Sequence, residues 1–309
     1  MVPSAEGAQT TRSIAVIINP ISGTGGRIDV ARARAATAAA LLTSHGADPS
    51  NVHLTERAGH AREIALNAIS RGIATVVAWG GDGTMNEVGT ALAFSGVALA
   101  LVPSGSGNGL ARELGVPFDP SAALDVALRG TERTIDAGEI DGRLFFNIAG
   151  VGLDARVAHR FAVHGLQKRG FARYMRLTMR ELSEYQPDVL TVTTPASSIC
   201  KPSLLVAIAN GRQYGNGAVI APHARLDDGR LDVITINARS LVRASLELPF
   251  VFMGMIDRVA GVTMETAESV TIASASPIVY HLDGEPIAGT LGISARVRPA
   301  ALKIKVPAR

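Results

Sequence analysis

The chain has 309 residues, of which 47% are hydrophobic and 18% charged, and this composition excludes a disordered protein. The length is sufficient for two domains with a sizeable core. A net charge of +3 suits a phosphate ligand or an anionic membrane surface, and it is too small to argue for a nucleic-acid partner. The only cysteine, Cys200, excludes an intrachain disulfide framework and favours a reducing compartment.

The first 13 residues contain no apolar segment of the kind found in secretory signals, so we expect a cytoplasmic protein. The most hydrophobic run covers residues 248–256 and is too short to span a bilayer. We therefore expect no transmembrane segment, and any contact with the inner face of the membrane to be peripheral. The same run suits a homodimer contact or a lipid pocket equally well, which leaves the oligomeric state open.

The N-terminal part alternates between predicted strands and predicted helices. Short apolar runs predict strands at 14–18, 52–55, 73–78 and 97–102. Alanine-rich or amphipathic segments predict helices at about 30–44, 58–70 and 88–94. This alternation predicts an α/β domain over residues 1–132, with a parallel sheet and right-handed crossovers.

The pattern changes near residue 131, after which short strands separated by turns predominate. We expect strands at 134–139, 144–149, 190–194, 204–210, 231–236, 270–273 and 278–282, interrupted by helical segments at about 154–184 and 240–257. This pattern predicts a mostly antiparallel β-sandwich domain over residues 133–290, with a last strand at about 291–309 that can return to the first domain. No Pro, Gly or Ser-rich linker separates the two, so we expect them to pack closely around a cleft.

Three glycine-rich loops, at residues 19–23, 80–84 and 103–108, each follow a predicted strand. Because ligands bind beyond the carboxyl ends of strands in such sheets, these loops are expected to converge at one edge. Backbone N–H groups beside glycines can approach an anion, and a helix N-terminus favours negative charge. The sequence thus predicts a phosphate site. The hydroxyls of Thr55 and Ser106 could bind adenosine or phosphate oxygens, although a local cap or turn explains them equally well.

Acidic residues occur in two further places besides Asp82, which stands among the glycines of the 80–84 loop. Asp283 and Glu285 flank a glycine at the end of a predicted strand, and a turn is the simpler explanation of this spacing. Three aspartates crowd the 221–232 loop, where a solvated turn and a cation site are equally well supported. The basic stretch 154–176 is explained by the solvated face of amphipathic helices, with an anionic membrane surface as the alternative.

Five motifs in this order resemble the diacylglycerol kinase catalytic-domain family, which includes bacterial lipid kinases, ceramide kinases and sphingosine kinases. They are Asn-Pro-x-Ser-Gly at 19–23, Thr-Glu-Arg-x-x-His-Ala at 55–61, Gly-Gly-Asp-Gly-Thr-x-Asn-Glu at 80–87, Pro-x-Gly-Ser-Gly-Asn at 103–108 and Leu-Asp-Gly-Glu-Pro at 282–286. The resemblance covers residues 14–306. The Gly-Gly-Asp-Gly-Thr core is shared with NAD kinases and phosphofructokinases, whereas the ordered set is specific.

The resemblance implies a Rossmann- and phosphofructokinase-like first domain and an ATP-dependent, Mg²⁺-dependent lipid kinase, with diacylglycerol as the default acceptor. It implies Glu285 as the general base, with Asp82 as the second candidate and otherwise the organiser of magnesium and phosphates. The residues that would contact ATP are Asn19, Pro20, Ile21, Ser22, Gly23, Thr55, Gly81, Asp82, Gly83, Thr84, Met85, Asn86, Glu87 and Ser106.

The family also implies a structural magnesium ion, held by the Asp228 side chain and the carbonyls of Arg225 and Arg230, and a second magnesium that arrives with ATP. It places Asp154 at the lipid headgroup and matches Arg173 to an arginine that reaches the γ-phosphate. The chain departs from many bacterial diacylglycerol kinases at Gly109, where those proteins carry an aspartate, and at Ser106, which replaces threonine. Together with the Thr-Glu-Arg motif at 55–57 and His60, these departures lean toward the sphingosine and ceramide kinase pattern, so the acceptor lipid stays open.

Two other functions remain as alternatives. The first is an NAD-kinase-like enzyme with a soluble acceptor, against which the motifs at 103–108 and 283–286 argue. The second is a nucleotide- or lipid-binding regulator without turnover, against which the intact Asp82 and Glu285 argue.

Overall fold

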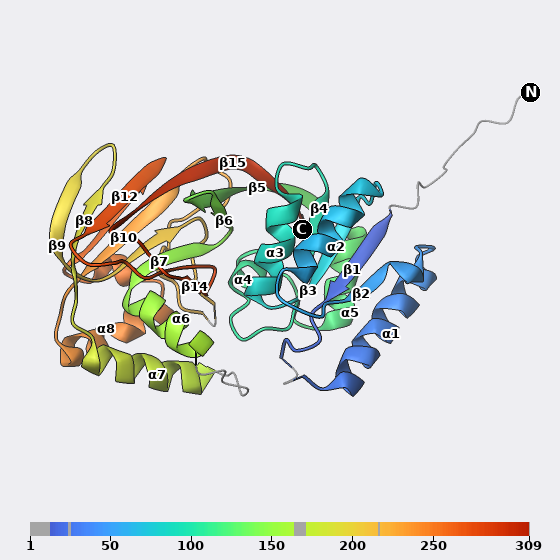
Figure 1. Cartoon of the computed structure of the whole chain (residues 1–309), viewed down its shortest axis with the longest axis horizontal. Helices are drawn as coiled ribbons and strands as arrows, with labels where there is room; N and C mark the ends of the chain where they lie inside the picture. The colour runs from blue at the N-terminus through green and yellow to red at the C-terminus, as the bar shows by residue number, and fades with distance from the viewer. Residues whose placement is uncertain (1–12, 24–25, 164–170, 216, 309) are drawn as a thin grey trace, which may run out of the picture.

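The computed structural model describes residues 13–23, 26–163, 171–215 and 217–308, without the side chains of 161–163, 171–176 and 241. The chain forms two lobes that lie side by side and are joined by long strands (Figure 1). Among the described residues, no helix combines the length and the apolar character required to cross a bilayer.

The N-terminal lobe is a parallel α/β unit. Its strands β1 (Ile14–Ile18), β2 (Val52–Leu54), β3 (Thr75–Gly80) and β4 (Ala98–Pro103) lie in the order β2-β1-β3-β4. Its helices are α1 (Ile28–Ser44), α2 (His60–Ser70), α3 (Asp82–Leu92), α4 (Gly109–Glu113) and α5 (Pro120–Arg129), with a short 3-10 helix, η1 (Pro49–Asn51). Because β1, β3 and β4 are buried along their whole length, their sequences are continuous apolar runs.

The C-terminal lobe is a mostly antiparallel sandwich. Its strands are β7 (Ile148–Gly152), β8 (Val189–Thr193), β9 (Ser198–Ala209), β10 (Leu231–Asn237), β11 (Val262–Ala267), β12 (Ser269–Ser274), β13 (Tyr280–Leu282) and β14 (Glu285–Ile287). Strand β9 belongs to both layers, because its first half pairs with β8 and its second half with β7 and β10. Helices α6 (Leu153–Val163), α7 (Phe171–Glu184) and α8 (Leu241–Phe252) lie along one side of the sandwich, followed by η2 (Ile256–Arg258).

Two long strands run through both lobes. Strands β5 (Thr131–Ile140) and β15 (Gly292–Val306) pair with each other, and the short β6 (Arg143–Phe145) extends this ribbon beyond β5. In the C-terminal lobe β15 pairs with β12, whereas near its end it pairs in parallel with β4. The last strand of the chain therefore completes the N-terminal sheet.

The predicted fold class, an α/β domain followed by an antiparallel β-sandwich, is confirmed, but some predicted elements were wrong. The segment 144–149 was expected as one strand and is divided between β6 and β7. The division has a cause, because the N–H groups of Phe146 and Asn147 donate to the Asp283 carboxylate instead of to a neighbouring strand. Helix α3 begins at Asp82, so the predicted 80–84 turn is shorter than expected and Asp82 lies in the first helical turn.

Candidate active site

The glycine-rich loops follow β1, β3 and β4, on the side of the N-terminal lobe where α3 and α4 face β14 and α6 (Figure 1). The loops after β3 and β4 touch, since a Cβ added to Gly105 would lie 2.6 Å from the Cα of Gly81. A Cβ added to Gly23 would lie 2.2 Å from the carbonyl oxygen of Ser104. Three loops from distant parts of the sequence thus meet through bare backbone, as phosphate binding requires.

The buried Ser104 hydroxyl beside these glycines has no hydrogen-bond partner among the described residues. Buried hydroxyls are nearly always paired, and an orphaned one suggests a missing partner. An oxygen of a bound nucleotide would satisfy it, so the loops and this hydroxyl fit a phosphate-bearing ligand.

Asp82 connects two of the loops. Its Oδ2 accepts the N–H of Asn108 and its Oδ1 accepts the N–H of Gly109, both at 2.9 Å. Burial raises the pKa of Asp82 to about 6, although these two backbone donors act in the opposite direction. Both oxygens of Asp82 are therefore engaged in holding the loop after β4.

The loop at 19–23 is fixed against the first turn of α3. The side-chain amide of Asn19 donates to the Thr84 hydroxyl at 2.9 Å, while its Oδ1 accepts the N–H of Ile21. The Ser22 carbonyl accepts from Arg34, whereas the Ile21 side chain is 65% exposed. Pro20, Ser22 and Gly23 lie in the same loop. The structure thus brings the first predicted nucleotide motif next to the 80–84 motif.

Other predicted nucleotide contacts have side chains that interact within the protein. Met85 belongs to the hydrophobic core, Asn86 donates to Asp283, and Glu87 accepts the N–H of Gly59 at the start of α2. Thr55 follows β2 and is partly buried, and Ser106 is exposed in the loop after β4. For all five residues, contact with a nucleotide remains a prediction.

The acidic turn of the C-terminal lobe, residues 283–285, contains a buried carboxylate, Asp283, and an exposed carboxylate, Glu285. Asp283 is buried and accepts four hydrogen bonds, from the N–H groups of Phe146, Asn147 and Ile148 and from Asn86 of α3. Glu285 is exposed at the start of β14. A Cβ added to Gly83 would lie 2.5 Å from the Glu285 Oε1. The two candidate acids of the sequence, Glu285 and Asp82, therefore meet at the first turn of α3.

Asp154 lies in the first turn of α6 and is buried. Its Oδ2 accepts from the Tyr214 hydroxyl at 2.7 Å and contacts Nε2 of His281 at 3.2 Å, while its Oδ1 accepts the N–H of Ala155. Neither His281 nor Tyr214 was predicted from the sequence, because neither has a partner at a recognisable spacing. Arg173 falls in α7, and its side chain lies outside the described part of the structure.

The 221–232 loop contains the residues expected to hold a structural magnesium ion. Asp227 pairs with Arg133, and Asp228 is exposed and accepts the N–H of Arg230. Arg225 belongs to the same loop, and burial beside Asp228 raises the pKa of Asp232 to about 6. In the described residues, no group of three or more His, Cys, Asp or Glu residues is arranged to hold a metal ion. The magnesium site remains a prediction.

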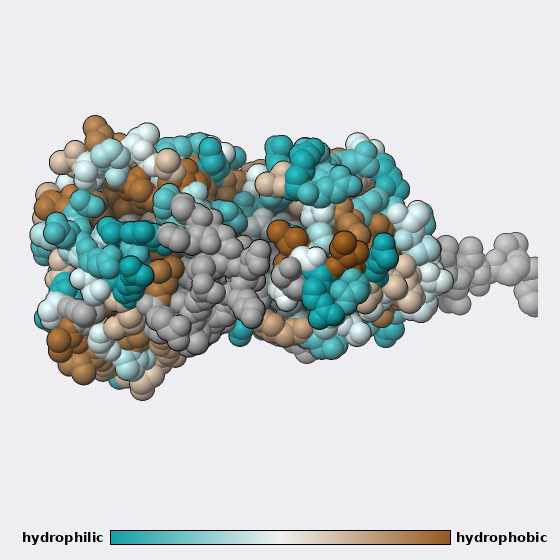
Figure 2. Space-filling view, turned by 60° about the horizontal axis from the view of Figure 1, so that its bottom comes forward, coloured by the Kyte–Doolittle hydropathy of each residue, from teal (hydrophilic) through white to brown (hydrophobic). Residues whose placement is uncertain are grey.

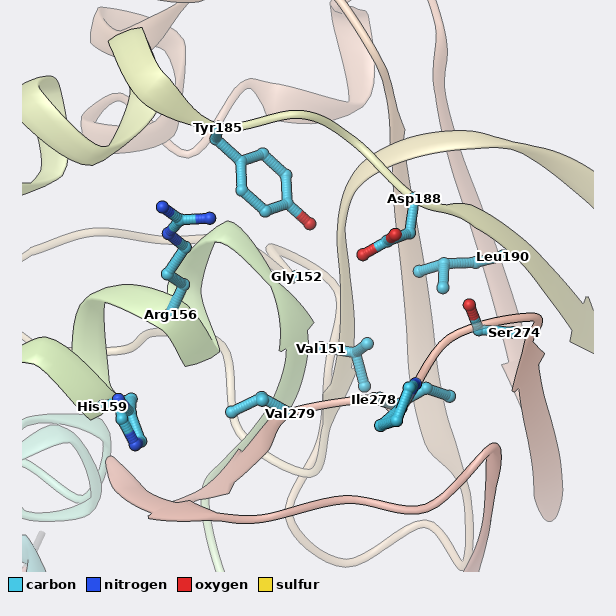
Figure 3. Close-up of a pocket in the computed structure, with 11 residues that line it drawn as sticks. Val151, Gly152, Arg156, His159, Tyr185, Asp188, Leu190, Ser274, Ile278 and Val279 are labelled. Carbon is cyan, nitrogen blue, oxygen red and sulfur yellow. The ribbon is translucent and has the colours of Figure 1, made fainter.

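A pocket with a cavity volume of about 170 Å³ opens between α6, the end of α7, β8 and the segment before β13 (Figure 3). Val151, Leu190 and Ile278 give it an apolar wall that belongs to the sandwich core. Its polar groups include Tyr185, whose pKa is raised to about 12 by burial and by nearby acids, and Arg156, which is held by Glu181 at 2.7 Å. Strand β13 leads from this pocket to the acidic turn.

The fold and these loops define a two-domain protein that pairs a glycine-loop α/β lobe with a β-sandwich lobe. Residues 13–140 match the diacylglycerol kinase catalytic domain, and residues 147–306 match the YegS C-terminal NAD kinase beta sandwich-like domain. The chain belongs to the diacylglycerol kinase catalytic-domain family.

Individual relatives agree with this assignment. The chain is 34% identical over 267 residues to a probable lipid kinase YegS-like of Pseudomonas aeruginosa, a match that covers 83% of this chain and 84% of the relative. A protein of the same description from Pseudomonas savastanoi is 32% identical over 268 residues, with 84% of each chain covered.

Two solved structures share the fold. A putative diacylglycerol kinase from Bacillus anthracis superposes with a TM-score of 0.75 at 20% identity, over 96% of this chain and 97% of that one. An NAD kinase from Archaeoglobus fulgidus in complex with ATP superposes with a TM-score of 0.52 at 11% identity, over 94% and 93% of the two chains.

Proposed function

We propose that the protein is an ATP-dependent lipid kinase that transfers the γ-phosphate to a lipid hydroxyl, with diacylglycerol as the default acceptor. The observation that carries this proposal is the position of the exposed Glu285 carboxylate over Gly83, directly beside the glycine loops. A proton acceptor and a phosphate cradle thus face the same space from different lobes. Phosphoryl transfer depends mainly on such positioning and on charge neutralisation.

The backbone N–H groups of Gly81 and Gly83 and the hydroxyl of Ser104 would hold phosphate oxygens. When bound, Mg²⁺ supplies neutralisation of the phosphate charge. Glu285 accepts the proton of the acceptor hydroxyl as that oxygen becomes bonded to phosphorus and the bond to the nucleoside diphosphate breaks. Asp82 is the weaker candidate for the base, because both of its oxygens already accept backbone N–H groups.

The pocket in Figure 3 supports an acceptor with a long apolar part. Its apolar wall would contact hydrocarbon, and β13 would guide the polar end toward Glu285. Substitution of Ile278 by Trp is expected to raise the KM for the lipid and leave the KM for ATP unchanged. Leu66→Trp, on the exposed face of α2 in the other lobe, is the matched control.

Contact with a membrane is proposed to be peripheral. Figure 2 shows apolar side chains gathered along the lower part of the C-terminal lobe. On α8 and directly after it, Val242 and Leu246 are each 70% exposed and Met253 is 65% exposed. Exposed apolar groups of this kind suit a bilayer surface, and Arg243, which pairs with Glu247 of the same helix, lies among them. Co-sedimentation with phosphatidylglycerol vesicles should fall for Val242→Glu combined with Leu246→Glu.

The deciding experiment uses labelled ATP, Mg²⁺ and detergent micelles with a panel of diacylglycerol, ceramide, sphingosine and NAD. Labelled phosphatidic acid is the expected product. A labelled sphingolipid product would keep the chemistry and change the acceptor. Label in NAD alone would move the protein to the soluble-acceptor alternative, and label in no acceptor would overturn the kinase proposal.

A further inference from the structure

Three polar side chains that belong to none of the five motifs connect α6 to the acidic turn, and they are Asp154, Tyr214 and His281. The Asp154 carboxylate lies between the Tyr214 hydroxyl at 2.7 Å and Nε2 of His281 at 3.2 Å. His281 is 3% exposed and Asp154 is 9% exposed, so the contact is enclosed by protein. The packing is close, since a Cβ added to Gly150 would lie 1.9 Å from Asp154 Oδ2.

The hydrogen bonds of His281 assign its tautomer. The N–H of Gly284 donates to Nδ1 at 3.3 Å, so Nδ1 is an acceptor and carries no proton. The ring proton then lies on Nε2, which faces Asp154. The imidazole is thereby held at both nitrogens, with a carboxylate on one side and the backbone of the acidic turn on the other. Gly284 is the residue directly before Glu285.

The other end of this connection reaches the nucleotide loops. The carbonyl oxygen of Tyr214 would lie 2.8 Å from a Cβ on Gly109, and Gly215 forms a bridge with Asn108. Gly109 and Asn108 are the two residues whose N–H groups Asp82 accepts. A continuous series of contacts thus links Asp82 to the turn that carries Glu285.

We propose that Asp154 and His281 are positioning residues, which fix the turn at 283–284 and so place the Glu285 carboxylate over the first turn of α3. The inference rests on the proposed function, because it takes Glu285 as the group that accepts the acceptor proton. It also differs from the headgroup contact expected for Asp154, since both oxygens of Asp154 already have partners within the protein. Small displacements of a reacting group cost about 10²-fold in rate, so such positioning is a measurable part of catalysis.

Two substitutions separate the two nitrogens of His281. His281→Asn keeps an acceptor near the Nδ1 position and loses the donor that reaches Asp154. His281→Gln keeps a donor near Nε2 and loses the acceptor for Gly284. Because both contacts are required to orient the turn, each variant is expected to lower kcat by about 10²-fold with unchanged KM for ATP and for the lipid. His45→Asn, at the end of α1 in the other lobe, is the matched control.

Asp154→Asn tests the carboxylate. An amide cannot accept at both positions, so either the Ala155 N–H or the His281 Nε2–H faces another donor. We expect the same loss in kcat with unchanged KM values. A raised lipid KM at unchanged kcat would overturn the inference in favour of a headgroup contact, and unchanged kcat and KM in all three variants would also overturn it.

A readout independent of turnover guards against variants that fail to fold. In ¹⁵N-labelled wild-type protein, long-range ¹H–¹⁵N spectra should show His281 protonated on Nε2 and bare on Nδ1, and the opposite tautomer would overturn the inference. Tyr214→Phe keeps the ring and removes only the hydroxyl, and it should lower kcat with KM unchanged. Wild-type protein that phosphorylates no lipid would instead overturn the proposed function, so the two failures are distinguishable.

Discussion

At the scale of residues, the two candidate acids differ in their surroundings. Asp82 accepts two backbone N–H groups and has a raised pKa caused by burial. Glu285 is exposed beside the glycine of the first turn of α3. Enzymes assign different roles to two carboxylates by such differences in environment. The geometry thus supports the proposal that Glu285 is the proton acceptor, whereas Asp82 holds the loop after β4.

Substitution of Glu285 by Gln should remove turnover and keep ATP binding. The amide fills the same volume but cannot take a proton, so kcat should fall by about 10²–10⁴-fold. ATP affinity, measured by calorimetry, should stay at the wild-type value. Glu268→Gln, in the exposed turn between β11 and β12, is the matched control. Retained turnover would transfer the role of base to Asp82 or to solvent.

Asp82 should also make stability depend on pH. Its pKa of about 6 in the folded protein lies above the value of 3.8 for the free side chain, so the folded state binds the proton more tightly. The Asp82 contribution to the free energy of unfolding therefore falls as pH rises from about 4 to about 6 and stays constant above that range.

Asp82→Asn cannot titrate, so its difference from wild type should change across this range and be constant at higher pH. Asp232 and Asp283, whose pKa values burial also raises, are present in both proteins. Urea unfolding at several pH values measures the difference. A difference that is independent of pH would contradict the raised pKa.

The sequence predicted which residues gather at this site better than it predicted what they contact. The motifs include Asp82 and Glu285, and the structure places Asp82 in the first turn of α3 and the Glu285 carboxylate over Gly83 of that turn. The hydrogen bonds of Asp283 could not be foreseen, since they come from residues more than one hundred positions earlier in the chain. His281 and Tyr214 carried no signal for the same reason, because their partner Asp154 is close only in the folded chain.

At the scale of elements, the Asp283 carboxylate connects the acidic turn to both lobes through hydrogen bonds. Asp283 accepts from the backbone between β6 and β7 and from Asn86 of α3. The backbone of Asp283 has φ +47°, a conformation that residues other than glycine rarely adopt. The strand break at 146–147 and the turn at 283–284 therefore depend on each other.

Asp283→Ala should destabilise the protein by more than about 3 kcal/mol, because each buried donor left without an acceptor costs about 1–3 kcal/mol. Asp141→Ala is a matched control, since Asp141 has φ +49° in an exposed turn and would bear the same backbone strain. Urea unfolding gives both values. Equal losses in the two variants would show that strain, not hydrogen bonding, dominates at Asp283.

Helix α5 and strand β11 were not predicted from the sequence, for different reasons. Helix α5 begins with Asp119 as N-cap and Pro120 in its first turn, a standard start signal. Strand β11 is only partly buried and lacks a continuous apolar run, so periodicity gave little indication of it. Strand β15 was expected to return to the first domain, but its parallel pairing with β4 depends on a register that no local pattern specifies.

At the scale of the whole molecule, the N-terminal sheet is incomplete without the end of the chain. Leu302 and Ile304 of β15 are buried in the N-terminal core, and Lys305 is 1% exposed between the carbonyl of Gly130 and Glu132. A fragment of residues 1–132 would expose one edge of β4 together with the apolar surface that these side chains cover. Burial of the Leu302 and Ile304 side chains contributes about 1.5–3 kcal/mol each.

We therefore expect the fragment 1–132 to lack a cooperative thermal transition and to bind a hydrophobic dye. The same fragment should gain such a transition when residues 299–309 are joined to its C-terminus by a flexible linker, because the added strand restores the edge of β4. A linker fusion in which Leu302 and Ile304 are both replaced by Asp is the control, and it should behave like the bare fragment. Cooperative unfolding of the bare fragment would contradict this prediction. It would show that the N-terminal lobe is an autonomous domain and that β15 serves mainly to hold the two lobes together.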